Sequence, residues 1–316
     1  MYMLGKELTE LLGIKYPVIQ GAMAWIANAE LAAAVSNAGG LGIIAAGNTP
    51  PELLEKELIK IRELTDKPYG MNIMLMSPTA QAAVELAAKY RVKVLTTGAG
   101  SPGKVIERLK PLGTIIMPVV ASTAVAIRAV RQGAQAIVAE GMEAGGHIGE
   151  LTTMVLTPLV AQAVNVPVVC AGGIVDGRGM AAAFAMGAAG VQVGTRFVCS
   201  TECTVHPNYK NALVKAKERC TSVTGAPTGH PVRCIDNKLT KEFLRLEYEH
   251  ASNEEIEKLG VGRLRAAVVD GDIEMGSVMS GQSAALVNDV RPCADIITSM
   301  VSEAEQILKK LGAAAQ

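Results

Sequence analysis

The feature that most constrains the fold is a regular alternation of short aliphatic runs and amphipathic stretches over residues 17–198. The aliphatic runs occupy residues 17–20, 41–46, 69–75, 92–96, 114–120, 136–139, 166–171 and 190–198. Stretches whose apolar residues recur about every 3.6 positions lie between them, at 29–38, 51–64, 79–90, 104–112, 123–132, 154–164 and 178–186. Uninterrupted aliphatic strands are typical of parallel sheets that helices cover. Eight such strands alternating with helices predict an α/β fold, a (β/α)8 TIM barrel.

The main alternative is an open, doubly wound sheet. That fold normally shows fewer strands and a G-x-G-x-x-G turn after the first of them. Here Gln20-Gly21-Ala22-Met23 follows the first aliphatic run, which is not that turn. The sequence therefore favours the barrel.

The alternation stops near Cys199, where the composition changes. The following stretch is richer in charge and holds three of the four histidines, His206, His230 and His250. We predict a small, mostly helical subdomain at residues 201–279, inserted after the eighth strand. Residues 1–200 and 280–316 would form the barrel, with an amphipathic helix at 294–311 closing it.

Composition and charge narrow the class of protein. A formal net charge of +0 argues against nucleic acid as the main partner. Charged residues such as Lys6 and Glu7 interrupt the start, and no apolar run is long enough to cross a bilayer, so we expect a soluble, cytoplasmic protein without a membrane partner. The six cysteines form no C-x-x-C pair, which predicts free thiols and no metal site.

The most informative motif is a glycine-rich loop that carries His147. It follows the aliphatic run at 136–139 and reads Glu140-Gly-Met-Glu-Ala-Gly-Gly-His-Ile-Gly. Gly145 and Gly146 would let this loop pass close to a planar ligand. An imidazole held in such a loop is suited to proton transfer near neutral pH, so we predict that His147 is catalytic.

Glycines at the ends of the last two strands indicate a phosphate site. Gly172-Gly173 follows the seventh strand and Gly194-Thr195 lies on the eighth, where this fold commonly binds phosphate. The glycine pairs could also simply form tight turns. A flat phosphorylated cofactor at this edge could be FMN or pyridoxal phosphate. Pyridoxal phosphate needs a lysine at a strand end, and Lys93 falls at the start of its strand, so FMN is favoured.

Other strand ends supply the remaining candidates for the cofactor site. Most follow a predicted strand on the edge where barrel active sites lie, whereas Asn72 and Gln192 lie within predicted strands. They are Gly21, Ala22, Met23, Gly47, Asn72, Glu140 and Gln192.

Several of these segments together resemble a known family. They are residues 17–25, 38–42, 70–75, 96–100, 140–149, 171–174, 191–197, 206–210 and 276–282. Over nearly its whole length the chain resembles the FMN-dependent enoyl-(acyl-carrier-protein) reductase II family, within the wider nitronate monooxygenase group. Ala22 departs from this pattern, because a second glycine is expected there.

The resemblance implies both a reaction and roles for the residues. The trans-2 double bond of an acyl thioester on acyl carrier protein would be reduced by NADH or NADPH through the flavin, with a monovalent cation assisting. His147 would face the thioester, while Met23, Asn72 and Glu140 would line the flavin. Gly172, Gly173, Gly194 and Thr195 would hold the phosphate, and Gln192 and Gln282 are weaker candidates for the rim. The family also implies a homodimer.

The resemblance suggests a docking site for the acidic carrier protein. The insertion contains a basic run, Lys210, Lys215, Lys217 and Arg219, that could supply a basic rim. A solvated helix face is the other interpretation of this run.

Two other functions fit the same sequence. A nitronate monooxygenase would use His147 as a base on a nitroalkane and would reoxidise the flavin with O₂, without a pyridine nucleotide. A sensor that binds flavin or phosphate without turnover would show no reduction of its flavin by pyridine nucleotides.

Overall fold

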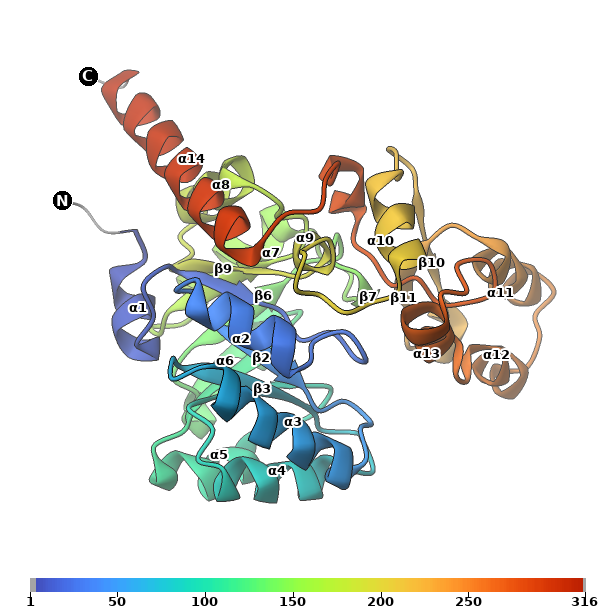
Figure 1. Ribbon diagram of the computed structural model, residues 1–316, viewed down its shortest axis with the longest axis horizontal. Coiled ribbons are helices and arrows are strands. Elements are labelled where there is room, and N and C mark those ends of the chain that lie inside the picture. The colour runs from blue at the N-terminus through green and yellow to red at the C-terminus, as the bar shows by residue number, and fades with distance from the viewer. Residues whose placement is uncertain (1–3, 315–316) are drawn as a thin grey trace.

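Eight parallel strands form a barrel in the computed structural model, which describes residues 4–314 (Figure 1). Residues 1–3 and 315–316, the ends of the predicted barrel, lie outside the described residues. The order around the sheet is β1-β9-β8-β6-β5-β4-β3-β2. The strands are β1 Val18–Gln20, β2 Gly42–Ala45, β3 Tyr69–Met74, β4 Val94–Gly98, β5 Ile115–Val120, β6 Ile137–Glu140, β8 Val168–Ala171 and β9 Gly190–Val193. The predicted barrel is thus confirmed, and the doubly wound alternative is wrong.

The sheet closes between its first and last strands, β1 and β2. Ile19 and Leu41 form a parallel bridge, and the Gln20 amide donates to the Leu41 carbonyl at 2.9 Å. The Gln20 side chain, which is fully buried, continues the contact between β1 and β2 by hydrogen bonding to the main chain of Ile43. Its Oε1 accepts from the Ile43 amide at 3.1 Å and its Nε2 donates to the Ile43 carbonyl at 3.2 Å. A side-chain amide thereby satisfies backbone groups that the short strand β1 leaves unpaired.

Helices cover the outside of the barrel, close to the predicted positions. They are α2 Ala29–Asn37, α3 Pro51–Leu64, α4 Ala80–Lys89, α5 Gly103–Leu109, α6 Thr123–Gln132, α7 Thr153–Ala163 and α8 Gly177–Ala185. Asn28 and Ser122 cap α2 and α6, accepting from the amides of Leu31 and Val125. The C-terminal helix α14 (Cys293–Ala314) contacts α8, where Glu303 accepts from the Gly177 amide at 2.8 Å.

Aliphatic side chains fill the barrel interior and leave its C-terminal end free. Ile19, Ile43, Met117 and Val138 are among the interior residues that are completely buried. Helix α1 (Lys6–Leu12) covers the opposite, N-terminal end with Leu8 and Leu12. In the part of the chain described, no helix is long and apolar enough to cross a membrane. All six cysteines are free, as predicted.

The eighth predicted strand is shorter than expected. The aliphatic run continues to Val198, but β9 ends at Val193 and residues Thr195–Val198 form a short helix, α9. Gly194 makes the change of direction, with φ −109° and ψ −77°. Period-2 and helical apolar patterns are indistinguishable over so few residues, which explains the error.

The insertion was predicted to be mostly helical, and it contains four α-helices, but it also contains an antiparallel sheet that the sequence did not predict. Its helices are α10 Pro207–Val214, α11 Lys238–Tyr248, α12 Asn253–Gly260 and α13 Arg263–Arg265, followed by a π-helical turn at Ala266–Asp270. Strands β10 (Thr221–Thr224) and β11 (Val232–Ile235) pair antiparallel, and β11 also pairs with β7 (Gly146–His147). The His147 loop of the barrel is therefore one edge of the insertion sheet, which lies beside the barrel in Figure 1.

Candidate active site

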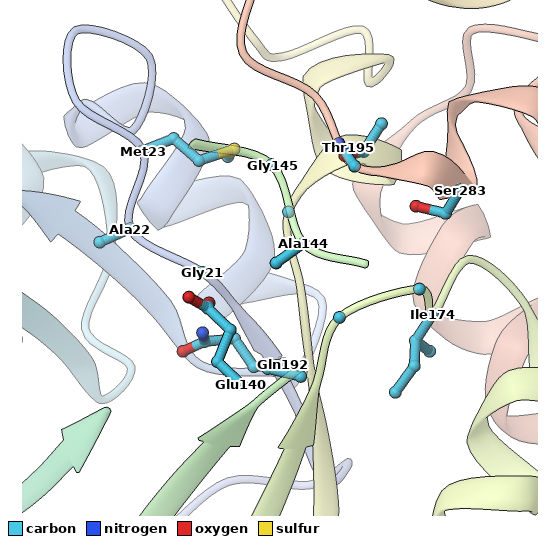
Figure 2. Close-up of a pocket in the computed structure, with 15 residues that line it drawn as sticks. Gly21, Ala22, Met23, Glu140, Ala144, Gly145, Ile174, Gln192, Thr195 and Ser283 are labelled. Carbon is cyan, nitrogen blue, oxygen red and sulfur yellow. The ribbon is translucent and has the colours of Figure 1, made fainter. Parts of the chain in front are cut away.

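A pocket with an empty volume of about 480 Å³ lies at the C-terminal ends of β1, β6, β8 and β9 (Figure 2). Ten of the predicted cofactor residues line it: Gly21, Ala22, Met23, Glu140, Gly145, Gly172, Gly173, Gln192, Gly194 and Thr195. Segments far apart in the sequence therefore converge on one site because parallel strands end at the same edge of the barrel.

Glu140 and Gln192 form the inner wall of the pocket. Strand register places them in one layer, because Glu140 pairs with Ala171 and Ala171 pairs with Gln192. Figure 2 shows both side chains turned into the pocket from β6 and β9. Burial raises the pKa of Glu140 to about 7, so this carboxyl group titrates near neutral pH. The wall therefore offers an amide and a proton-bearing carboxyl group to a polar ligand.

Two glycine corners form one end of the pocket. Gly172 and Gly173 have φ values of +99° and +78°, which only glycine adopts without strain. Among residues 4–314, no protein group accepts a hydrogen bond from the main-chain amides of Gly173, Gly194 or Thr195. The Thr195 Oγ1 accepts from the Gly281 amide at 3.0 Å, which leaves its own proton to donate. These donors suit a phosphate group.

His147 lies on β7, outside the residues that line the pocket. It pairs with Val232 of β11, and the Ile148 amide donates to the Pro231 carbonyl at 3.1 Å. The side chain is exposed, yet the surrounding protein and the charge of His230 lower the pKa of His147. A neutral imidazole at pH 7 has one N–H to donate and one nitrogen to accept a proton.

Three other predicted residues also lie outside the pocket lining. Gly146 is buried, with φ +75°, and pairs with Arg233. Asn72 on β3 is half-buried and donates to the Thr96 Oγ1 at 2.9 Å. Gly47 follows β2, and its carbonyl accepts from the Thr79 hydroxyl at 3.4 Å. The structure thus places Asn72 and Gly47 in contacts between neighbouring strands and loops.

Sequence reasoning missed the part of the pocket wall that comes from residues 281–283. Gly281 and Ser283 line the pocket, whereas the predicted Gln282 is exposed. The main-chain N–H of Gln282 donates to the Glu143 carbonyl at 3.0 Å. Ala144, Ala171 and Ile174 complete the wall. The signal in the sequence was the return to small and apolar residues over 279–287, which follows the charged insertion.

Glu143 was also missed, and it ties the His147 loop to the barrel. Its carboxylate accepts from the Thr153 amide at 2.8 Å and from the Thr153 hydroxyl at 2.9 Å. The same hydroxyl approaches the carbonyls of Ala171 and Gly172 at 3.2 and 3.0 Å. Thr153 thereby connects α7, the His147 loop and the first glycine corner.

Replacing Glu140 by glutamine should stabilise the protein above neutral pH. Because burial raises the pKa of Glu140 from 4.5 to about 7, the unfolded chain releases this proton first, and the free energy of unfolding falls as pH rises through that window. The loss amounts to about 3 kcal/mol, and glutamine avoids it because it carries no charge. Urea denaturation without added flavin measures the free energy of unfolding of both proteins. E140Q should be more stable than wild type at about pH 8, and this difference should disappear at about pH 5. An equal difference at both pH values would contradict the assignment.

No group of three or more His, Cys, Asp or Glu side chains within residues 4–314 is arranged to hold a metal ion.

Comparisons with known proteins agree with this geometry. The chain is similar to a solved structure of FabK from Thermotoga maritima, with a TM-score of 0.95, 50% sequence identity and coverage of 97% of this chain and 98% of that one. A probable nitronate monooxygenase of Staphylococcus saprophyticus is 33% identical over 97% of this chain and 99% of its own length. The (3aS,4S,5R,7aS)-5-hydroxy-7a-methyl-1-oxo-octahydro-1H-indene-4-carboxyl-CoA dehydrogenase of Rhodococcus jostii is 32% identical over 99% of both chains. A family model for nitronate monooxygenase matches residues 6–303, and this chain therefore belongs to the nitronate monooxygenase family.

Proposed function

We propose that this protein is an FMN-dependent enoyl-(acyl-carrier-protein) reductase that uses NADH or NADPH. Its similarity to FabK at 50% identity over nearly the whole chain is the observation that carries this proposal. The carboxyl-CoA dehydrogenase relative is named for a thioester, which supports an acyl thioester as the substrate class. The reaction would be the last step of each cycle of fatty acid elongation, in the cytoplasm.

The residues at both ends of the pocket support FMN as the cofactor. The free amides of Gly173, Gly194 and Thr195 would hold the phosphate. Glu140, Gln192 and Met23 would surround the ring and ribityl chain, with Ala22 in place of a glycine on the same wall. The chemistry that bound FMN would supply is hydride transfer between the pyridine nucleotide and the β-carbon of the enoyl thioester. We also propose that a monovalent cation assists, which replacement of K⁺ by choline in the assay would test.

His147 would act on the thioester from the edge of the pocket. Its lowered pKa keeps the imidazole neutral at pH 7, so one N–H can donate to the oxygen on which negative charge develops. The same group could deliver the proton that the α-carbon needs.

Nitronate monooxygenase is the second candidate. The family model and the Staphylococcus relative favour it, and a neutral imidazole is also the form that could remove a proton from a nitroalkane. The identity to FabK is higher, at 50% against 33%, and this difference favours the reductase.

Anaerobic stopped-flow titration of the yellow holoenzyme separates these functions. Bleaching of the flavin by NADH or NADPH, followed by return of the colour with crotonyl thioester, is the result we expect. Flavin that stays oxidised with both nucleotides but bleaches with a nitronate would identify the monooxygenase. Flavin that responds to neither donor would indicate a binding protein without turnover.

Part of the predicted basic run is available to an acidic carrier protein. Lys215, Lys217 and Arg219 are exposed after α10, whereas Lys210 donates to the Ser200 carbonyl at 2.6 Å. We propose that the three exposed cations dock acyl carrier protein beside the pocket.

Reversing two of these charges should weaken the use of carrier-bound substrate only. In K215E/K217E we expect KM for crotonyl-acyl carrier protein to rise about tenfold at low salt, because steering by opposite charge is lost. KM for crotonyl-CoA should stay unchanged. The matched control is K309E, an exposed charge reversal on α14. An equal rise in KM for both thioesters would contradict carrier docking at this site. So would an equal rise in KM for the carrier-bound substrate in K309E.

We also propose that the protein is a homodimer. Helix α7 contains no charged residue and exposes Met154, Val155 and Leu159, with Met154 67% exposed. An uncharged apolar helix face of this kind suits burial against a second copy of the chain. The molar mass in solution, measured by light scattering, tests this assembly.

A further inference from the structure

Arg233 is a buried cation that the proposed reaction does not yet use. It lies on β11 of the insertion and is only 4% exposed. Its Nε donates to the Met142 carbonyl at 3.1 Å and its Nη1 donates to the Thr221 hydroxyl at 3.1 Å. Both hydrogen-bond acceptors are uncharged, and the Glu143 carboxylate acts on the guanidinium only through its charge. Burying a guanidinium without a direct ion pair is costly, so a residue of this kind usually serves a specific purpose.

The Met142 carbonyl stands at the base of the His147 loop. The Met142 amide donates to the Leu151 carbonyl at 2.8 Å, which closes the loop that these two residues bound. On the other side of the base, the Glu143 carboxylate is fixed to Thr153. Arg233 therefore holds the loop where it leaves the barrel.

The backbone of the same strand holds the tip of the loop. Arg233 pairs with Gly146, and Val232 pairs with His147. The Ile148 amide donates to the Pro231 carbonyl at 3.1 Å. One strand thus fixes both the base and the tip of the loop, through a side chain and through main-chain bonds. A loop with three glycines would otherwise have many conformations available.

We propose that Arg233 is a positioning residue that sets the place of His147 relative to the pocket. The proposal rests on the proposed function, because the step it affects is the transfer to the enoyl thioester. Arg233 does not line the pocket, so it should have no effect on flavin binding or on reduction of the flavin by the nucleotide. Its effect should be confined to the step in which His147 takes part.

The test compares R233M with wild type in separate half-reactions of the holoenzyme. We expect bleaching by the pyridine nucleotide at the wild-type rate, but return of the colour with crotonyl thioester slowed by about 10–100-fold, because displacement by about 1 Å has that effect. Hydrogen–deuterium exchange should speed up in residues 142–149 and stay unchanged in α3. The control T221V removes only the outer hydrogen bond of Arg233 and should behave as wild type.

A double mutant distinguishes positioning of His147 from a general structural role. If Arg233 acts through His147, R233M/H147A should be no slower than H147A alone. The proposal would be overturned if the double mutant lost rate by the product of the two single-mutant factors. It would also be overturned if R233M slowed both half-reactions equally. If R233M does not fold, R233K serves in the same assays, since lysine keeps the charge but cannot bond both oxygens.

Failure of the proposed function would give a different result from failure of the Arg233 inference. Wild-type flavin would then not recover its colour with crotonyl thioester at all. The exchange experiment would still report whether Arg233 holds the loop, and unchanged exchange in residues 142–149 of R233M would reject the inference.

Discussion

Replacing His147 by alanine should lower the rate of enoyl-thioester reduction by about 10²–10⁴-fold, the usual contribution of a positioned acid or base. Bleaching of the flavin by the pyridine nucleotide should continue at the wild-type rate, because His147 does not line the pocket that would hold the ring. Stopped-flow measurement of the two half-reactions gives both rates. The substitution should not disturb the fold, because β7 pairs through its main chain and the side chain is exposed.

His230 provides the matched control for this experiment. It is also exposed, lies two residues before β11, and is the neighbour whose charge lowers the pKa of His147. In H230A we therefore expect the pKa of His147 to rise and the rate to change little. A loss in H230A as large as in H147A would show that the assignment of the catalytic histidine is wrong.

The second large effect should come from Gly145, where even one methyl group has no space. A Cβ placed there would lie 2.5 Å from the Ser280 carbonyl carbon and 2.7 Å from the Gly281 nitrogen, both backbone atoms. We expect G145A to lose about 1–3 kcal/mol of folding free energy, as overpacked sites do. It should also bind FMN more weakly, because Gly145 and Gly281 both line the pocket.

Chemical denaturation and flavin titration measure these two losses. The control is G312A on the exposed end of α14, where nothing lies within 4 Å of an added Cβ. That substitution should be neutral or slightly stabilising, since alanine favours helix. Wild-type stability and flavin affinity in G145A would show that the 280–281 segment can move away freely.

The barrel could be predicted from sequence because its strands lie in short, mostly apolar runs that alternate regularly with helical stretches. The Pro51–Leu64 and Thr123–Gln132 helices even match their predicted bounds, since proline at N1 and a serine cap mark where they begin. Strand β7 could not be predicted. Gly146 and His147 carry no strand pattern, and they pair only because a partner strand far along the chain reaches them.

The candidate site likewise contains residues that could be predicted from sequence and residues that could not. Gly172, Gly173 and Gly194 were predictable, because the end of a barrel strand has a known place in the fold. Gly281, Ser283 and Arg233 approach the site or its loop from beyond the insertion or from within it, where no such rule places them. Short-range patterns describe elements, whereas these contacts depend on how two parts of the chain pack.

The strand pairing between β7 and β11 has a consequence for cooperativity. Small parts of a protein often open without global unfolding. If the insertion opens in this way, the loop loses the partner that holds His147, while the glycine corners on β8 and β9 belong to the barrel and keep their place. The chemistry would then switch off and return with the refolding of one small subdomain, while the glycine corners of the barrel persist throughout.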